Sequence, residues 1–183
     1  MTIAPRRSQG RSCHVIPIRE SLKQARRAAN PDMGYDAGAE ALMKETRYGM
    51  GVDVALPYEQ AVERATDELQ KEGFGILTTI DVRQTMKQKL DKEFRKYTIL
   101  GACNPPLAYR AFEAELEIGL LLPCNVAVYE TDANHSVVSA MAPIVGLGMV
   151  GGNPALKDVA READERLRRA LKALESIDGP PGA

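Results

Sequence analysis

Aromatic residues are scarce in this sequence: they make up 5% of it, and tryptophan is absent. Proteins that bind single-stranded nucleic acids stack bases on aromatic side chains, and quaternary amines bind in aromatic cages. Positive and negative charges nearly cancel, with a formal net charge of -1, so no field of one sign attracts a phosphate backbone. We therefore expect no nucleic-acid partner.

Cysteine and long apolar runs are also scarce. Three cysteines, an odd number, do not form a disulfide framework and are typical of a reducing compartment, so we predict a cytoplasmic protein. The N-terminal segment has no sustained apolar run, so it lacks the core of a signal peptide and cannot span a bilayer, and we expect no membrane partner. Cys13 and His14 are adjacent but have no second pair of ligands nearby, so we predict no metal site.

The distribution of charge and apolar residues divides the chain into three parts. Residues 1–46 carry an excess of arginine and lysine and few apolar residues, so we predict a basic, mostly disordered leader. Residues 47–177 have regular apolar patterns and are expected to form a single domain of ordinary size. Residues 178–183 are expected to form a flexible tail. Met43, just before the patterned region, is a candidate start of the native protein.

Apolar residues recur with two different periods along residues 47–177. The segments around Val52, Ile76, Ile99, Val126 and Val138 are short and rich in β-branched residues, as strands are. Between and after them, apolar residues recur every three or four positions, as on one face of a helix. The sequence therefore predicts a two-layer α+β domain with helices packed on one face of a mixed sheet. The expected order is strand, helix, strand, helix, strand, helix, strand, strand, helix.

Two Asn-Pro pairs mark the starts of helices. An asparagine side chain caps the exposed N–H groups of a first helical turn, and proline fits the first helical position. We therefore predict that Asn104 and Asn153 cap helices, the second of them the long C-terminal helix. That helix places acids four residues before bases, so we predict ion pairs within it. These are Glu162 with Arg166, Asp164 with Arg168, and Glu165 with Arg169.

Two of the three cysteines precede an asparagine, at Cys103-Asn104 and Cys124-Asn125, and these two cysteines are the candidate thiols. Cys103 stands between a strand and a capped helix, where the helix dipole lowers a thiol pKa and raises its reactivity. Cysteine is also among the most buried residue types, so the favoured interpretation is a packed, inert Cys103. Pro123 indicates an edge or a bulge in the next strand, where Asn125 would satisfy free backbone groups.

The two candidate thiols are expected to lie apart. A strand–helix–strand unit normally makes its strands parallel, so Cys103 would end one strand and Cys124 would stand near the start of the next. That arrangement places the thiols at opposite ends of the sheet, beyond the reach of a disulfide. We therefore predict no disulfide between them.

The segment GLGMVG, residues 146–151, matches the G-x-G-x-x-G pattern and follows a strand. A dinucleotide-binding fold needs a further parallel strand after the helix, and none follows here, so this interpretation is rejected. A glycine loop before a capped helix can still bind a carboxylate or phosphate through backbone N–H groups, and the alternative is a plain connecting loop. The candidate ligand-binding residues are Asn104, Asn125, Gly146, Gly148, Gly151 and Asn153.

Three segments resemble a known family. EGFGILTTIDVRQTMKQKL, YTILGACNPPLAYRAFEAELEIGLLLPCNVAVYE and GNPALKDVAREADERL are similar to the domain-of-unknown-function family numbered 302, over about residues 48–175. The Gly-Ala-Cys-Asn-Pro and Leu-Pro-Cys-Asn segments make the similarity specific. The resemblance implies a compact two-layer α+β homodimer without an established activity. Ala142-Pro143 departs from the family pattern, which often has an acidic residue before this proline, so a role that depends on that acid is in doubt.

Two functions fit these observations. The first is a small-ligand-binding or interaction domain that acts as a homodimer, with a second copy and a small anionic ligand as its partners. The second is a thiol-dependent protein in sulfur handling or redox sensing that uses Cys103 or Cys124. A thiol enzyme normally pairs its nucleophile with histidine or a resolving cysteine, and no C-x-x-C is present, so we favour a binding domain over an enzyme. No pattern identifies a cofactor.

Deletion of residues 1–42 tests the predicted leader. We expect the melting temperature to change little, because a segment with few apolar residues buries little area at about 25 cal/mol per Å². Thermal unfolding of the full-length and truncated proteins, followed by circular dichroism, measures this change. A fall of many degrees would show that the leader docks on the domain.

Overall fold

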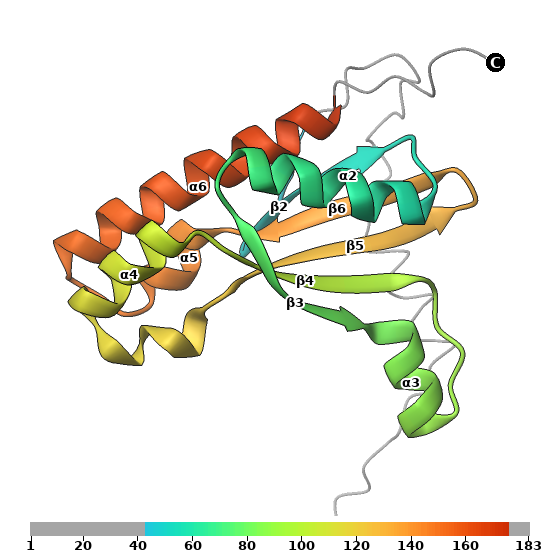
Figure 1. The fold of residues 1–183 in the computed structure, drawn as a ribbon, viewed down its shortest axis with the longest axis horizontal. Coiled ribbons are helices and arrows are strands. Elements are labelled where there is room, and N and C mark those ends of the chain that lie inside the picture. The colour runs from blue at the N-terminus through green and yellow to red at the C-terminus, as the bar shows by residue number, and fades with distance from the viewer. Residues whose placement is uncertain (1–42, 176–183) are drawn as a thin grey trace, which may run out of the picture. The chain divides into compact units, whose positions relative to one another are not determined.

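Six strands form one sheet in the computed structural model, in the spatial order β1-β2-β6-β5-β4-β3 (Figure 1). The structure describes residues 43–175. The strands are β1 (Lys44–Glu45), β2 (Gly49–Val54), β3 (Gly75–Asp81), β4 (Tyr97–Cys103), β5 (Cys124–Asp132) and β6 (His135–Met141). The helices are α2 (Tyr58–Lys71), α3 (Val82–Leu90), α4 (Pro105–Ala114), the 3-10 helix η1 (Leu116–Leu121), α5 (Pro143–Gly148) and α6 (Pro154–Glu175). All five predicted strand segments share this sheet, and β1, η1 and α5 are additions to the predicted order.

Every pair of neighbouring strands is antiparallel, so the prediction of a mixed sheet is wrong in this respect. The connection between β4 and β5 explains the difference. There α4 packs on η1 and α6 beyond the end of the strands, instead of crossing a face of the sheet (Figure 1). The chain therefore re-enters the sheet at the end where it left, and β5 runs back along β4. The α+β class itself is confirmed.

The core lies between the sheet and helices α2 and α6, which pack on each other across one face (Figure 1). Alternate residues of each central strand point to this face, as pleating requires. The predicted helical layer on one face is thereby confirmed for α2 and α6. Among the largest fully buried side chains of this core are Met50, Val52, Phe74, Leu100, Val126, Val128, Val138, Leu167 and Leu171.

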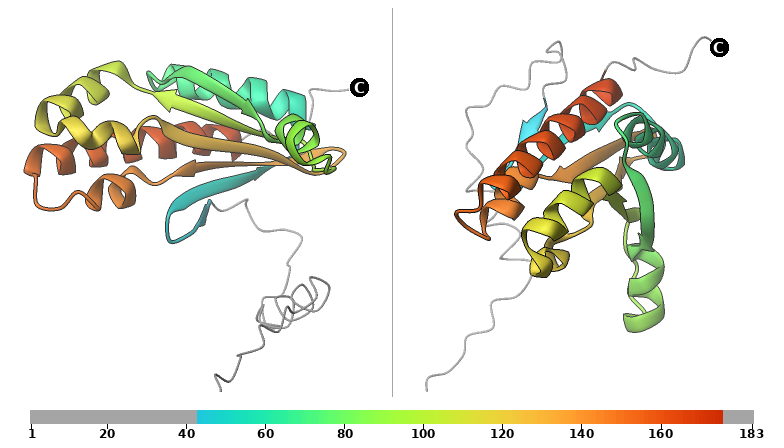
Figure 2. Two further views of the ribbon diagram at one scale, coloured as in Figure 1. Left: turned by 90° about the horizontal axis from the view of Figure 1, so that it is seen from below. Right: turned by 60° about the vertical axis from the view of Figure 1, so that its left-hand side comes forward.

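Helix α3 departs from that layer. It continues β3 beyond the sheet and projects from the body of the domain (Figure 1 and the right-hand view of Figure 2). Asp81 caps it, because its carboxylate accepts the Gln84 N–H at 2.8 Å. None of its nine residues is buried. The apolar stripe of Val82, Met86 and Leu90 is therefore at most partly covered within residues 43–175.

Helix α6 forms two of its three predicted ion pairs. Arg166 and Arg168 bind the acids four residues before them, at 2.9 and 2.7 Å. The predicted pair of Glu165 with Arg169 is wrong, because Arg169 binds Glu72, just after α2, at 2.8 Å. Both oxygens of that carboxylate accept from the guanidinium, and this two-pronged geometry is stronger than a contact along one exposed helix face.

The sheet begins before the expected domain boundary at residue 47. β1 pairs with β2, and Met43 packs against the core. The rest of the predicted disordered leader, residues 1–42, lies outside the described residues. The tail predicted for residues 178–183 lies outside them as well. Within residues 43–175, no helix is long and apolar enough to cross a membrane.

Candidate functional site

Asn104 holds α4 in place. Its Oδ1 accepts the Leu107 N–H at 3.3 Å, which caps the helix as predicted, and its Nδ2 donates to the carbonyl oxygen of Glu72 at 3.4 Å. Gly73 leaves room for this amide, since a Cβ there would lie 2.8 Å from the Asn104 Nδ2. Both ends of the buried amide are therefore engaged within the protein, and neither is turned to a ligand.

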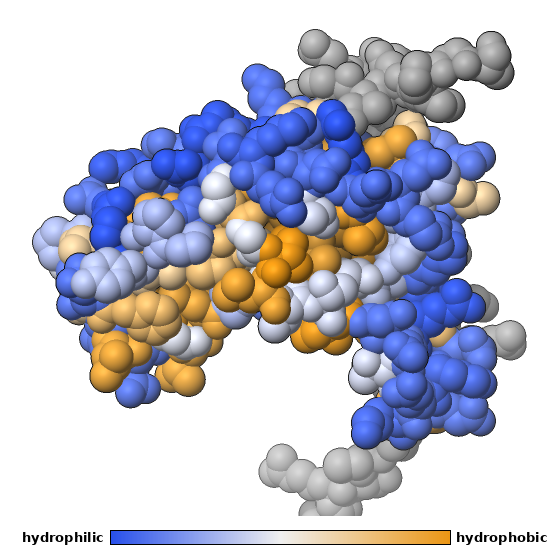
Figure 3. Space-filling model, in the orientation of Figure 1, coloured by the Kyte–Doolittle hydropathy of each residue, from blue (hydrophilic) through white to orange (hydrophobic). Residues whose placement is uncertain are grey.

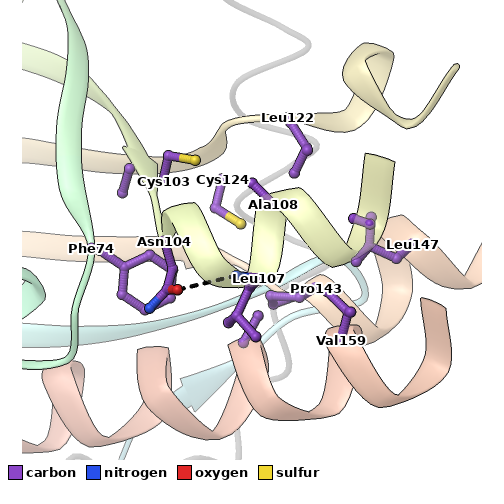
Figure 4. Close-up of a pocket in the computed structure, with 13 residues that line it drawn as sticks. Phe74, Cys103, Asn104, Leu107, Ala108, Leu122, Cys124, Pro143, Leu147 and Val159 are labelled. Atoms are coloured by element: carbon purple, nitrogen blue, oxygen red, sulfur yellow. Dashed lines mark hydrogen bonds between the residues drawn. The ribbon is translucent and has the colours of Figure 1, made fainter. Parts of the chain in front are cut away.

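Cys103 and Cys124 lie at the same end of the sheet, so the prediction that they lie at opposite ends is wrong. β4 and β5 are antiparallel, and Cys124 is the direct partner of Ala102, next to Cys103. Neighbouring positions of such a ladder point to opposite faces, so the two side chains leave opposite sides of it. Both thiols are free, as predicted, and both line one cavity (Figure 4).

This cavity is small and apolar. It lies between the ends of β4 and β5 and helices α4, α5 and α6, and its volume of about 30 Å³ has room for one or two water molecules. A metabolite does not fit in this space. Apart from the cysteines and Asn104, the walls include Phe74, Leu107, Leu122, Pro143, Leu147 and Val159 (Figure 4).

Burial raises the pKa of both thiols and so makes them less reactive. It raises the pKa of Cys103, which is half-buried. Burial, and to a smaller extent the neighbouring Cys103, raises the pKa of Cys124 to about 11. Desolvation disfavours the thiolate, so burial opposes the effect that the helix dipole was expected to have on Cys103. Both thiols are protonated at neutral pH, which favours the packed interpretation.

The glycine segment after β6 is partly helical, so the predicted loop is wrong for its first half. Gly146 and Gly148 belong to α5, and only Gly151 lies in the loop before α6, with a φ of +73°. Gly146 is buried, and a Cβ there would lie 3.0 Å from the Met141 Cε. This glycine therefore serves the packing of α5 on β6.

A recess of about 90 Å³ lies before α6, lined by glycines, Asn153 and Lys157. Asn153 accepts the Ala155 N–H at 3.0 Å, as expected of a residue that caps this helix, and its Nδ2 donates to the Ala114 carbonyl oxygen at 3.2 Å. Both ends of this amide are engaged, as they are in the cap of α4. The recess therefore offers an anion only backbone N–H groups and the Lys157 ammonium.

A larger hollow lies on the sheet face opposite α2 and α6. Its volume is about 580 Å³, within the range of small-molecule sites. The middle of its floor combines two short side chains with one larger apolar one, because Ser139 of β6 pairs with Ala127 of β5, which in turn pairs with Ile99 of β4. We call it the sheet-face hollow and define it by Tyr48, Tyr97, Asn125, Ala127, Tyr129 and Ser139.

Three tyrosines stand at the sheet-face hollow. Tyr97 and Tyr129 are cross-strand partners whose rings stack, with centroids 5.3 Å apart and planes 7° apart. Burial raises the pKa of Tyr97, and the neighbouring phenols of Tyr129 and Tyr48 raise it further. The Tyr97 phenol therefore stays protonated at neutral pH and can both donate and accept hydrogen bonds.

Asn125 is the one predicted ligand-binding residue that lies in this hollow. It is exposed on β5, and its side chain forms no hydrogen bond within residues 43–175. The bulge in which its amide was expected to serve is absent from the start of this strand, because β5 begins at Cys124 and Pro123 precedes it. The Asn125 amide is thus available to a ligand.

The sequence does contain a signal for the rest of the hollow. Asn125, Ala127 and Tyr129 alternate along β5 with the buried Val126 and Val128, so the two sets face opposite sides of the sheet. The apolar set is enough to predict a strand. Only the other set, Asn125, Ala127 and Tyr129, marks the face that no helix of the described residues covers.

Residues 43–175 contain no group of three His, Cys, Asp or Glu side chains placed to hold a metal ion. His135 lies where β6 leaves the β5–β6 turn, as its turn-rich neighbours predict. Its Nδ1 is 2.9 Å from the Asp132 carboxylate, which orients the imidazole within the turn.

These features define a small antiparallel α+β domain in which, within residues 43–175, helices cover one face of the sheet and leave the other open. The family model of DUF302, described as a domain of unknown function, matches residues 50–174, so the chain belongs to the DUF302 family. The chain is similar to a crystal structure of an uncharacterized conserved DUF302 protein from Bacillus stearothermophilus, with 30% identity and a TM-score of 0.64. The similarity covers 70% of this chain and 99% of that one. Among curated proteins, no match was found.

Replacement of Asn104 by alanine tests its structural role. The change leaves the Leu107 N–H without its acceptor and removes the link to Glu72, so we expect the free energy of unfolding to fall by about 1–2 kcal/mol. Urea denaturation followed by circular dichroism measures this fall. The control is Asn134→Ala, at an exposed turn position, which should change stability little. Equal stability of the two variants would contradict the assigned role.

Iodoacetamide labelling measures whether Cys103 is activated. Because burial raises its pKa, we expect slower labelling near neutral pH than for a free cysteine. The rate should rise about tenfold per pH unit as the thiolate forms. Cys124 should be labelled only after unfolding, and mass spectrometry of peptides separates the two sites. Fast labelling of native Cys103 at neutral pH would reject the packed interpretation.

Proposed function

We propose that this protein is a homodimeric domain that binds a small, uncharged ligand in the sheet-face hollow. The observation that carries the proposal is the hollow itself, about 580 Å³ in volume and lined without a single charged residue. Small-molecule sites of this size are concave and mostly apolar, and a few polar groups orient the ligand. The sheet-face hollow has this composition.

The polar groups of the hollow indicate the shape of the ligand. Asn125 offers a donor and an acceptor, and Tyr129 lies four residues further along β5, roughly 13 Å away at the usual rise of a strand. Ala127 stands between them with only a methyl group. A flat molecule with a ring system over Ala127 and polar atoms at both ends fits this pattern.

An anionic ligand, as expected from the sequence, would bind elsewhere. The lining of the sheet-face hollow carries no cation, whereas the recess before α6 carries Lys157. That recess is much smaller, at about 90 Å³, and the Asn153 amide beside it is already engaged. The recess is therefore the weaker candidate.

Exposed apolar side chains support the homodimer. Single domains seldom leave large apolar groups open to water in clusters, and clustered ones mark interaction surfaces. Leu77, Leu90, Leu116 and Leu120 are each more than 60% exposed. A cytoplasmic location belongs to the same proposal and is supported by the two free thiols of the described residues.

A thiol function of Cys103 is the second candidate, and one observation favours it. The antiparallel ladder brings Cys103 and Cys124 to one cavity, which a sulfur-handling protein with two cooperating thiols would need. Against it stand the raised pKa of both thiols and the absence of a histidine at the cavity. The binding domain, not an enzyme, is therefore the preferred function.

Native mass spectrometry of protein purified gently from its native host tests the hollow. We expect a small molecule to be retained by the wild type and lost from Ala127→Phe, because a phenyl ring would occupy the floor of the hollow. The control is Ala133→Phe, at an exposed position in the β5–β6 turn, which should retain the molecule. Circular dichroism checks that both variants are folded.

Nile red, a flat and uncharged dye, provides a readout that does not depend on the native ligand. We expect its fluorescence to rise with the wild type and with Ala133→Phe, and its Kd to increase about tenfold or more with Ala127→Phe. Equal dye binding by all three proteins, together with no retained molecule, would reject the sheet-face hollow as the site.

A further inference from the structure

The end of β3 and helix α3 form an arm, residues 77–95, that the rest of the described chain does not cover. β3 is the last strand of the sheet, and its outer edge pairs with no strand of residues 43–175. No residue from Leu77 to Arg95 is buried. A helix of nine residues is marginal in water without tertiary packing. The arm therefore needs a second surface to pack on.

The exposed side chains of the arm include large apolar ones. Leu77 and Ile80 on β3 are 65% and 48% exposed, and Leu90 and Phe94 at the far end are 62% and 44% exposed. Exposed strand edges are normally protected by charged residues or proline, but β3 has neither from Gly75 to Ile80. An uncharged apolar edge is typical of a strand that pairs with another chain.

The charges of the arm are basic. Helix α3 contains Arg83, Lys87 and Lys89 and no acidic residue. Lys87 is neutralised within the arm, at 2.8 Å from both Asp91 and Glu93. Arg83 and Lys89 form no ion pair within residues 43–175, so helix α3 presents two positive charges beside the apolar residues of the arm.

The surface formed by α4 and η1 has the complementary character. Phe112, Leu116 and Leu120 are 42%, 78% and 83% exposed there. Glu115 and Glu117 stand among them and form no ion pair with the described residues. Figure 3 shows this apolar patch at the lower left, hydrophilic side chains over α3 at the lower right, and a hollowed surface between the two.

We propose that the arm of one chain docks on a second copy of this chain. In this dimer β3 pairs antiparallel with the β3 of the copy, and α3 lies on the α4–η1 surface of the copy. The proposal rests on the homodimer of the proposed function and names the surfaces that form it. A second copy is the occupant because one chain carries both halves of the contact, the basic arm and the acidic α4–η1 surface.

The sheet register brings the two halves together. Gly75 pairs with Cys103, so the start of β3 lies beside the start of α4, whereas α3 follows the other end of β3. When two copies of β3 run antiparallel, the α3 of each therefore reaches the α4 end of the other. The two-fold axis of such a dimer generates two equivalent copies of this contact, as closed dimers require.

Charge exchange in the full-length protein tests the contact. One variant carries Arg83→Glu and Lys89→Glu, and the other carries Glu115→Lys and Glu117→Lys. Each variant alone brings like charges together, so we expect the Kd of its homodimer to rise about tenfold or more in analytical ultracentrifugation. An equimolar mixture restores opposite charges at both contacts, so we expect a heterodimer with a Kd close to that of the wild type.

Two further variants keep the test independent of folding. Leu77→Lys places a charge on the open edge of β3 and should also raise the Kd at least about tenfold, with little change in melting temperature, because this side chain is exposed. Arg47→Glu, a charge reversal at an exposed position in the turn between β1 and β2, should leave the Kd unchanged.

The outcomes separate this inference from the function on which it rests. A wild-type dimer whose Kd is unchanged in the arm and α4–η1 variants would overturn the arm contact and leave the homodimer standing. Two weakened variants that fail to form a heterodimer would overturn the pairing of these two surfaces. A wild-type protein that stays monomeric at high concentration would overturn both the homodimer and the arm contact, while Nile red binding would still decide on the hollow.

Discussion

The pleat of a single antiparallel sheet is the constraint on which the rest of this structure depends. Side chains of each strand alternate between two faces, and the helices that cross the sheet, α2 and α6, cover the same face. That face carries the valines and leucines of the core, and the other carries Asn125, Ala127, Tyr129 and Ser139 together with Ile99. Core residues and hollow residues therefore occupy alternate positions of the same strands. A shift of a strand by one residue would move both sets to the wrong face of the sheet.

Local signals in the sequence were sufficient for most of the secondary structure. Asn-Pro pairs predicted the start of α4 and α6, and acids four residues before bases predicted two ion pairs of α6. Strand direction was not predictable in this way, because an apolar alternation is the same whichever way the strand runs. The expected separation of Cys103 and Cys124 failed for that reason, since it followed from an assumed parallel crossover. The predicted pair of Arg169 is wrong because the observed partner, Glu72, lies far away in the sequence, just after α2.

The candidate site depends on which groups the fold leaves unused, and this explains why it was only partly predictable. Asn104 and Asn153 are predicted ligand-binding residues, and each precedes a proline. In the structure, their side-chain oxygens instead accept backbone N–H groups as helix caps. Asn125 is followed by valine instead, and its amide stays exposed in the hollow. An asparagine whose sequence context predicts a helix cap is thus the weaker candidate for binding a ligand. The positions of the helices decide which face of the sheet remains open. No local sequence pattern contains this information.

The floor of the hollow has a consequence for how this family can diverge. A Cβ on Gly51 would lie 2.3 Å from the Ser139 Oγ, and one on Gly101 would lie 2.3 Å from the Thr78 Oγ1. Neighbouring strands therefore limit each other's side-chain size on this face, and a larger residue at one position demands a smaller one opposite. Such paired exchanges reshape the floor without touching the core on the other face. Side-chain sizes on this face can therefore change in pairs while the core on the other face stays the same.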